Sequence, residues 1–104
     1  MASLTTRGRR TGLPRQVAVG FVEEPDGSIL VAANESADWA RNLEADPAAH
    51  VEVGGRRFRA VAEPLVPADH ARVITGLILR YGTPAERLGR GPSFRLRPIA
   101  DAVS

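Results

Sequence analysis

A glycine-bracketed turn between two extended segments constrains the fold of this chain more than any other feature of its sequence. Residues 4–6 have the composition of a short strand, and residues 14–23 carry apolar side chains at alternate positions, as half-buried strands do. Gly8 and Gly12 lie between these segments and suit the backbone of a tight turn. The sequence therefore predicts an antiparallel hairpin with its tip between the two segments.

Three arginines accompany this turn, with Arg9 and Arg10 inside it and Arg15 just beyond it. A guanidinium group presents its N–H donors as a planar fork, which binds phosphate or carboxylate through two parallel hydrogen bonds. Backbone N–H groups beside glycines can add a small anion-binding nest. The pattern indicates a site for a polyanionic small molecule, although Arg9 and Arg10 can also be solvated charges at an exposed hairpin tip.

More strands are expected in the rest of the chain. Residues 29–33 form a continuous apolar run, which indicates a central strand covered on both faces and paired with the strand before it. Gly54-Gly55 is a two-residue turn that joins strands at 50–53 and 56–65. The last strand, 94–97, alternates apolar side chains with arginines, so it is half exposed. The proline that follows marks an edge strand or the end of the strand.

Two helices are expected between these strands. Ser36 or Asp38 can cap the first helix, which ends before Pro47. Pro67 suits the first position of the second helix, and apolar residues recur from there at helical spacing as far as Tyr81. Each helix therefore has one apolar side that can cover a sheet.

These elements predict one α+β domain over residues 1–104, in which short antiparallel strands curl into a small barrel and two helices pack against it. A chain of 104 residues can bury a single hydrophobic core. It has no cysteine, no apolar run long enough to span a membrane and no secretory signal, so we expect a cytoplasmic protein. The net charge is only +2, which argues against a nucleic-acid partner.

The sequence holds no self-contained catalytic machinery. His50 is expected in a strand and His70 near a helix start, so they lack the spacing of a metal-binding pair. We assign both a structural or surface role and predict no metal site. Motifs for a nucleophilic serine, a P-loop or a dinucleotide-binding turn are absent from the sequence. If the chain is an enzyme, a bound cofactor must carry the chemistry.

Three segments, in the same order, resemble the deazaflavin-dependent nitroreductase family, which uses coenzyme F-420. Family members read approximately T-T-x-G-R-(K/R)-(S/T)-G-x-x-R, then W-x-x-N-L-x-A-x-P and V-x-V. Residues 5–15, 39–47 and 51–53 of this chain fit these patterns. The resemblance covers most of residues 4–63 and fades from Pro64 onward. It implies a split β-barrel of the flavin-binding type, and it is compatible with a homodimer.

The resemblance also implies a function and roles for individual residues. Coenzyme F-420 is a hydride carrier whose tail bears a phosphate and an oligoglutamate, so the chain would be an oxidoreductase that reduces a quinone or nitro-type acceptor. The positions that resemble tail-binding residues are Arg9, Arg10, Thr11, Gly12 and Arg15. Those that resemble the cofactor-binding segment beside the deazaflavin ring are Ala32, Ala33 and Asn34, with Trp39 on the helix that follows. Tyr81 resembles a tyrosine on the substrate side.

Two other classes of protein fit the same residues. A split-barrel protein that binds FMN, another flavin or a lipid without catalysis would need the same barrel. Nucleic-acid binding through the Arg-Gly-Arg-Arg turn fits less well, because no aromatic side chains interleave with these arginines. Trp39 is also open to two interpretations, as a cofactor contact or as a core anchor of its helix.

Overall fold

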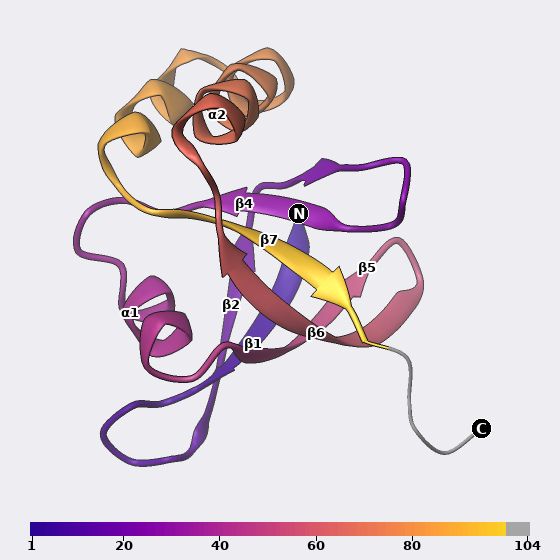
Figure 1. Cartoon of the computed structure of the whole chain (residues 1–104), viewed down its shortest axis with the longest axis vertical. Coiled ribbons are helices and arrows are strands. Elements are labelled where there is room, and N and C mark those ends of the chain that lie inside the picture. The colour runs from indigo at the N-terminus through magenta and orange to yellow at the C-terminus, as the bar shows by residue number, and fades with distance from the viewer. Residues whose placement is uncertain (100–104) are drawn as a thin grey trace.

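The structure of the chain is a computed structural model, which describes residues 1–99. Within these residues, antiparallel strands form one curled sheet with the order β2-β1-β5-β6-β7-β4-β3 (Figure 1). The strands are β1 (Ala2–Arg7), β2 (Pro14–Val19), β3 (Val22–Glu23), β4 (Ile29–Ala32), β5 (Ala48–Val53), β6 (Arg56–Pro64) and β7 (Ser93–Pro98). The predicted α+β split barrel is confirmed.

The helices are α1 (Asp38–Ala45), α2 (Pro67–Tyr81) and the 3-10 helix η1 (Thr83–Arg90). Figure 1 shows α1 beside the long loop that joins β1 to β2, and α2 with η1 at the opposite end of the molecule. η1 corrects the expectation of two helices, since Pro84 and Gly89 and the small number of apolar residues hide it in the sequence. None of the helices within residues 1–99 is long and apolar enough to cross a membrane.

The two outermost strands are neighbours in the chain, and this curls the sheet into a split barrel. β2 and β3 are separated by Gly20 and Phe21, yet they stand at opposite ends of the strand order. So short a link spans only about 10 Å, and the sheet has to curl until its edges approach each other. The single strand expected over residues 14–23 is therefore wrong. Side chains continue to alternate through the break, so the sequence pattern hides it.

Packing against α2 accounts for the break at Gly20. The ring of Tyr81 lies against this glycine, where a Cβ would come within 3.0 Å of the ring. The Tyr81 hydroxyl accepts a hydrogen bond of 3.3 Å from the backbone N–H of Phe21. The Arg80 guanidinium lies 4.4 Å from the centre of the Phe21 ring. The last turn of α2 thus holds the place where the barrel closes.

Apolar side chains form two layers. One fills the barrel interior and includes the apolar side of α1. The other lies outside the barrel, where Leu30 and Ala32 of β4 contact Val73, Ile74 and Leu77 of α2. β4 is therefore buried on both faces, which confirms the interpretation of the apolar run at residues 29–33.

Other expectations from the sequence are met with small changes. Gly54 and Gly55, with φ of 54° and 81°, form the two-residue turn between β5 and β6. β7 pairs with both β6 and β4, so the proline at residue 98 marks the end of an inner strand and not an edge strand. The short first strand extends over Ala2–Arg7.

Candidate functional site

The loop between β1 and β2 is closed by hydrogen bonds of its own. The N–H of Gly8 donates to the carbonyl of Leu13 at 2.8 Å, and the N–H of Gly12 donates to the carbonyl of Gly8 at 2.7 Å. The Thr11 hydroxyl accepts from the N–H of Leu13 at 3.2 Å. Gly12 has a φ of 74°, a backbone region that favours glycine. These contacts give the arginine-bearing loop a defined shape.

Asn42 of α1 fastens this loop to the barrel. Its side chain is buried, with 3% exposed. Its Oδ1 accepts from the backbone N–H of Arg9 at 3.2 Å and from the Arg9 Nη1 at 2.8 Å. Its Nδ2 donates to the Thr6 hydroxyl on β1 at 3.2 Å. Asn42 thus joins three separate elements, which are α1, β1 and the loop.

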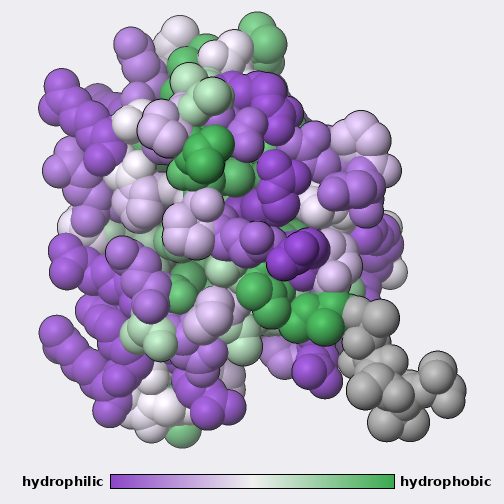
Figure 2. Space-filling view, in the orientation of Figure 1, coloured by the Kyte–Doolittle hydropathy of each residue, from purple (hydrophilic) through white to green (hydrophobic). Residues whose placement is uncertain are grey.

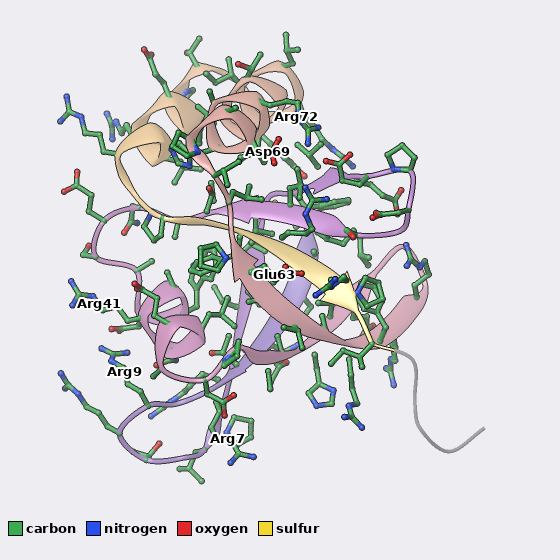
Figure 3. The ribbon with its side chains drawn as sticks, viewed as in Figure 1. Arg7, Arg9, Arg41, Glu63, Asp69 and Arg72 are labelled. Carbon is green, nitrogen blue, oxygen red and sulfur yellow. The ribbon has the colours of Figure 1, made fainter. Side chains whose placement is uncertain are left out.

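Arg9 has a second partner on α1. Its Nη2 lies 3.2 Å from Asp38 Oδ1, and its Nη1 donates to the Asp38 carbonyl at 3.4 Å. Figure 3 shows Arg9 between the loop and α1. The expected cap is wrong. α1 begins after Ala37 with no side-chain cap, so Ser36 and Asp38 lie one residue to either side of the cap position, where the Ser36 hydroxyl donates to Asn34 Oδ1 and the Asp38 carboxylate pairs with Arg9.

A cavity of about 510 Å³ opens between the loop, β2 and the start of α1. We call it the hairpin cavity. Its walls are formed by Gly8, Arg9, Arg10, Thr11, Arg15, Gln16, Val17, Asp38, Trp39 and Asn42. Hydrophilic residues gather along this edge of the molecule (Figure 2). The volume is in the range of small-molecule and cofactor sites.

The charge of the hairpin cavity is unbalanced. Three guanidinium groups face a single carboxylate among the lining residues, and that carboxylate already pairs with Arg9. Within residues 1–99, the side chains of Arg10 and Arg15 have neither an ion-pair partner nor a hydrogen-bond partner. Arg15 pairs across the strands with the buried Thr6, which places it on the inner face of the sheet, at the mouth of the barrel. Two cations are thus available to an anion.

The structure brings together part of the predicted site. Arg9, Arg10, Thr11, Arg15 and Trp39 line one cavity, and Gly12 shapes its loop. Trp39 meets both interpretations, because it lines the cavity and also packs on the core, with its ring 6.3 Å from that of Phe94.

Four predicted residues lie elsewhere. Ala32 and Ala33 are buried, with 6% and 1% exposed. Asn34 is exposed and lines a second cavity of about 930 Å³, the η1 cavity, which lies between the loop before α1 and η1. Tyr81 packs at the barrel closure. The hairpin cavity therefore contains the positions predicted to bind a coenzyme tail, and not those predicted to lie beside the ring or on the substrate side.

Sequence reasoning missed the contributions of Asp38 and Asn42 to the site. These residues are four apart on α1, a spacing that places two polar side chains on one side of a helix. That side adjoins the apolar side of α1, and a polar pair there signals a partner from another element. The partner, Arg9, is 33 residues away from Asn42 and could not be identified from local sequence.

The histidines take the roles expected of them. His50 is exposed on β5. The His70 Nδ1 lies 2.6 Å from the Ser93 hydroxyl, and its Nε2 lies 2.9 Å from the Gly89 carbonyl. Because a carbonyl can only accept, Nε2 carries a hydrogen, and in the neutral imidazole the Ser93 hydroxyl donates to Nδ1. His70 thus ties η1 to α2 and β7.

Comparison with known proteins gives one family match. The model of a family described as F420H(2)-dependent quinone reductase matches residues 1–86. The F420H(2)-dependent quinone reductase Rv1261c of Mycobacterium tuberculosis is 33% identical over 70 residues, which cover 64% of this chain and 47% of that protein. The chain thus spans about half the length of the curated relatives it matches.

Solved structures share the barrel. A chain described as an F420-H2 dependent reductase superposes with a TM-score of 0.78 at 23% identity, covering 92% of both chains. HutZ, a heme storage protein from Vibrio cholerae, superposes with a TM-score of 0.77 at 25% identity, covering 95% of this chain and 81% of HutZ. Proteins with different ligands therefore share this fold, and the ligand has to be argued from the site.

Proposed function

Because the chain belongs to the F420H(2)-dependent quinone reductase family, we propose that it binds reduced coenzyme F-420 and uses it to reduce a quinone. The deazaflavin-dependent family predicted from the sequence motifs is confirmed by the family match. The observation that carries the proposal is the hairpin cavity, where Arg10 and Arg15 are unpaired within residues 1–99 and face a common space.

The donor set of the cavity fits the tail of this coenzyme. Phosphate and carboxylate groups bind guanidinium through charge-assisted hydrogen bonds, and Arg10 and Arg15 have these donors available. The Thr11 hydroxyl can add a neutral donor on the same loop, and the absence of a side chain at Gly12 leaves the backbone there open to close approach. We assign the tail to these four residues and to the outer side of Arg9.

Other residues of the chain hold the rest of the site in place. When bound, the reduced deazaflavin supplies a hydride. Trp39 provides an apolar wall beside the arginines, and its packing on Phe94 fixes its orientation. Asn42 holds the loop against α1 through its hydrogen bonds to Arg9 and Thr6. Asn34 is the exposed member of the proposed ring-side segment, and the substrate-side role of Tyr81 remains a prediction.

The proposed reaction is tested by oxidation of reduced coenzyme F-420 with menadione as acceptor, followed through the visible absorbance of the oxidised coenzyme. We expect oxidation that requires both protein and acceptor. NADPH in place of the coenzyme should give no reaction, since the sequence lacks a turn that binds a dinucleotide pyrophosphate. Coenzyme binding without oxidation across quinones and nitro compounds would instead indicate a binding protein.

Retention of FMN, and not of the deazaflavin, after desalting would favour the flavin-binding alternative.

A chain described as a domain-swapped dimer superposes on this one with a TM-score of 0.77 at 23% identity, covering 92% of this chain and 78% of that one. Association of two copies of this chain remains a prediction, which light scattering would test.

A further inference from the structure

Two layers of contact hold the guanidinium of Arg9, and they differ in burial. The inner layer is Asn42, which is buried and receives both the Arg9 backbone N–H and Nη1. The outer layer is the Asp38 carboxylate, whose side chain is 84% exposed and which meets Nη2 at 3.2 Å. The Arg9 side chain itself is only 24% exposed, so the cation is positioned from inside and covered from outside.

The inner layer does not depend on the outer one. Asn42 bonds to Thr6 as well as to Arg9, and its position on α1 is fixed by neighbours in the barrel interior. Removal of the Asp38 carboxylate would leave these bonds in place. Arg9 therefore has a preset orientation. Its outer nitrogen, Nη2, points to the Asp38 carboxylate at the edge of the cavity.

The outer layer is weak and exchangeable. An ion pair whose carboxylate is largely exposed contributes little, because water solvates that carboxylate. Asp38 and Arg9 both line the hairpin cavity, where Arg10 and Arg15 stand unpaired within residues 1–99. A ligand held by Arg10 or Arg15 brings any further carboxylate close to Arg9 at high effective concentration, which favours exchange.

We infer that the outer nitrogen of Arg9 is a carboxylate subsite, and that Asp38 is an internal competitor which a carboxylate of the ligand displaces. This inference rests on the proposed function and deepens it, since it assigns one carboxylate of an oligoglutamate tail to Arg9. Asp38 thus lowers the affinity for the ligand. It acts on affinity through Arg9 and is not a catalytic residue.

The test is a double-mutant cycle on the full chain, with coenzyme F-420 and a tri-glutamate peptide as probes. Asp38→Asn should tighten binding of both probes by roughly two- to fivefold, the effect expected when an exposed ion pair no longer competes. In an Arg9→Ala background the same change should have no effect, because the contested group is gone. Inorganic phosphate, titrated in parallel, should respond less than tri-glutamate.

Asp46→Asn is the matched control. Asp46 follows the other end of α1, and its carboxylate lies 3.8 Å from Arg7, outside the hairpin cavity. Asp46→Asn removes the same charge as Asp38→Asn and should leave the affinities for coenzyme F-420 and for tri-glutamate unchanged. Equal effects of Asp38→Asn and Asp46→Asn, weaker binding in Asp38→Asn, or an effect that persists without Arg9 would each overturn the inference.

The two proposals can fail separately. If coenzyme F-420 binds the parent protein but Asp38→Asn changes nothing, the proposed function stands and the subsite is refuted. If the coenzyme does not bind while tri-glutamate responds to Asp38→Asn through Arg9, the subsite stands and the proposed function is refuted.

Discussion

The hairpin cavity and the η1 cavity both carry arginines, but their charges are organised differently. The hairpin cavity has three arginines and one carboxylate, Asp38. The η1 cavity is larger, at about 930 Å³, and its lining holds two arginines, Arg87 and Arg90, and two glutamates, Glu35 and Glu86, so its formal charge is balanced. Of these two cavities, the hairpin cavity is the one with excess positive charge.

The scaffolds of the two cavities differ as well. The hairpin loop has its own hydrogen bonds and is joined to the barrel through the buried Asn42. η1 has no buried residue and is held by His70 and by apolar contacts on α2. A cavity that combines unpaired cations with a fixed scaffold suits an anionic ligand, because its donors lose little freedom on binding. Arginine content alone does not distinguish the two.

Trp39 lies where the hairpin cavity meets the core, and its truncation should have the largest effect on stability. Trp39→Ala should cost about 3–4 kcal/mol of unfolding free energy, since it removes a large side chain packed on Phe94. Chemical denaturation measures this loss. If less than about 1 kcal/mol is lost while coenzyme binding collapses, Trp39 serves the ligand and not the core.

Two asparagines allow a direct comparison of the cavities, because Asn42 of α1 lines the hairpin cavity and Asn34, before α1, lines the η1 cavity. Asn42→Ala should cost about 2–3 kcal/mol, because the Thr6 hydroxyl and the Arg9 donors lose a buried partner. Asn34→Ala in the η1 cavity should cost about 0.5 kcal/mol, since it removes an exposed turn contact to Ser36. Thermal and chemical unfolding measure both losses. If the two variants lose the same unfolding free energy, Asn42 does not hold the hairpin loop to the barrel more strongly than Asn34 holds its own turn.

A pair of glycines gives the smallest expected effect. Gly12→Ala should cost about 1 kcal/mol, because the position has a φ of 74° and an alanine there is strained even though no atom obstructs it. Gly89→Ala in η1 should be neutral or stabilising by about 0.5 kcal/mol, since its φ is ordinary and the nearest atom to the new Cβ is 4.0 Å away. If Gly89→Ala loses as much unfolding free energy as Gly12→Ala, the positive φ of Gly12 does not set the two loops apart.

Local sequence patterns predicted most of the fold. The limits of α2, the Gly54-Gly55 turn and the doubly buried β4 follow from periodicity and turn chemistry, which act over a few residues. The break between β2 and β3 could not be predicted in this way. It depends on the Tyr81 ring, which reaches Gly20 from 61 residues away.

The site was predicted in part for the same reason. Arg10 and Arg15 are adjacent to the turn that presents them, so local sequence was sufficient to identify them. The engagement of Arg9 by Asn42 and Asp38 depends on how α1 docks against the hairpin, a tertiary contact that the motif does not encode. The motifs thus pointed to residues that line the hairpin cavity, and the structure distinguishes Arg10 and Arg15 from Arg9, which is already paired with Asp38.

We propose that the hairpin cavity binds the coenzyme tail through Arg10 and Arg15. Isothermal titration of coenzyme F-420 into the Arg10→Ala/Arg15→Ala variant, beside an Arg87→Ala/Arg90→Ala variant with the same loss of charge, tests it most directly. Each lost charge-assisted hydrogen bond is worth about 1.5–3 kcal/mol, so the first variant should bind at least about 100-fold more weakly than the parent protein. The second should stay within about twofold of the parent, since its arginines line the other cavity. Equal affinity of the two variants for the coenzyme would place its tail outside the hairpin cavity.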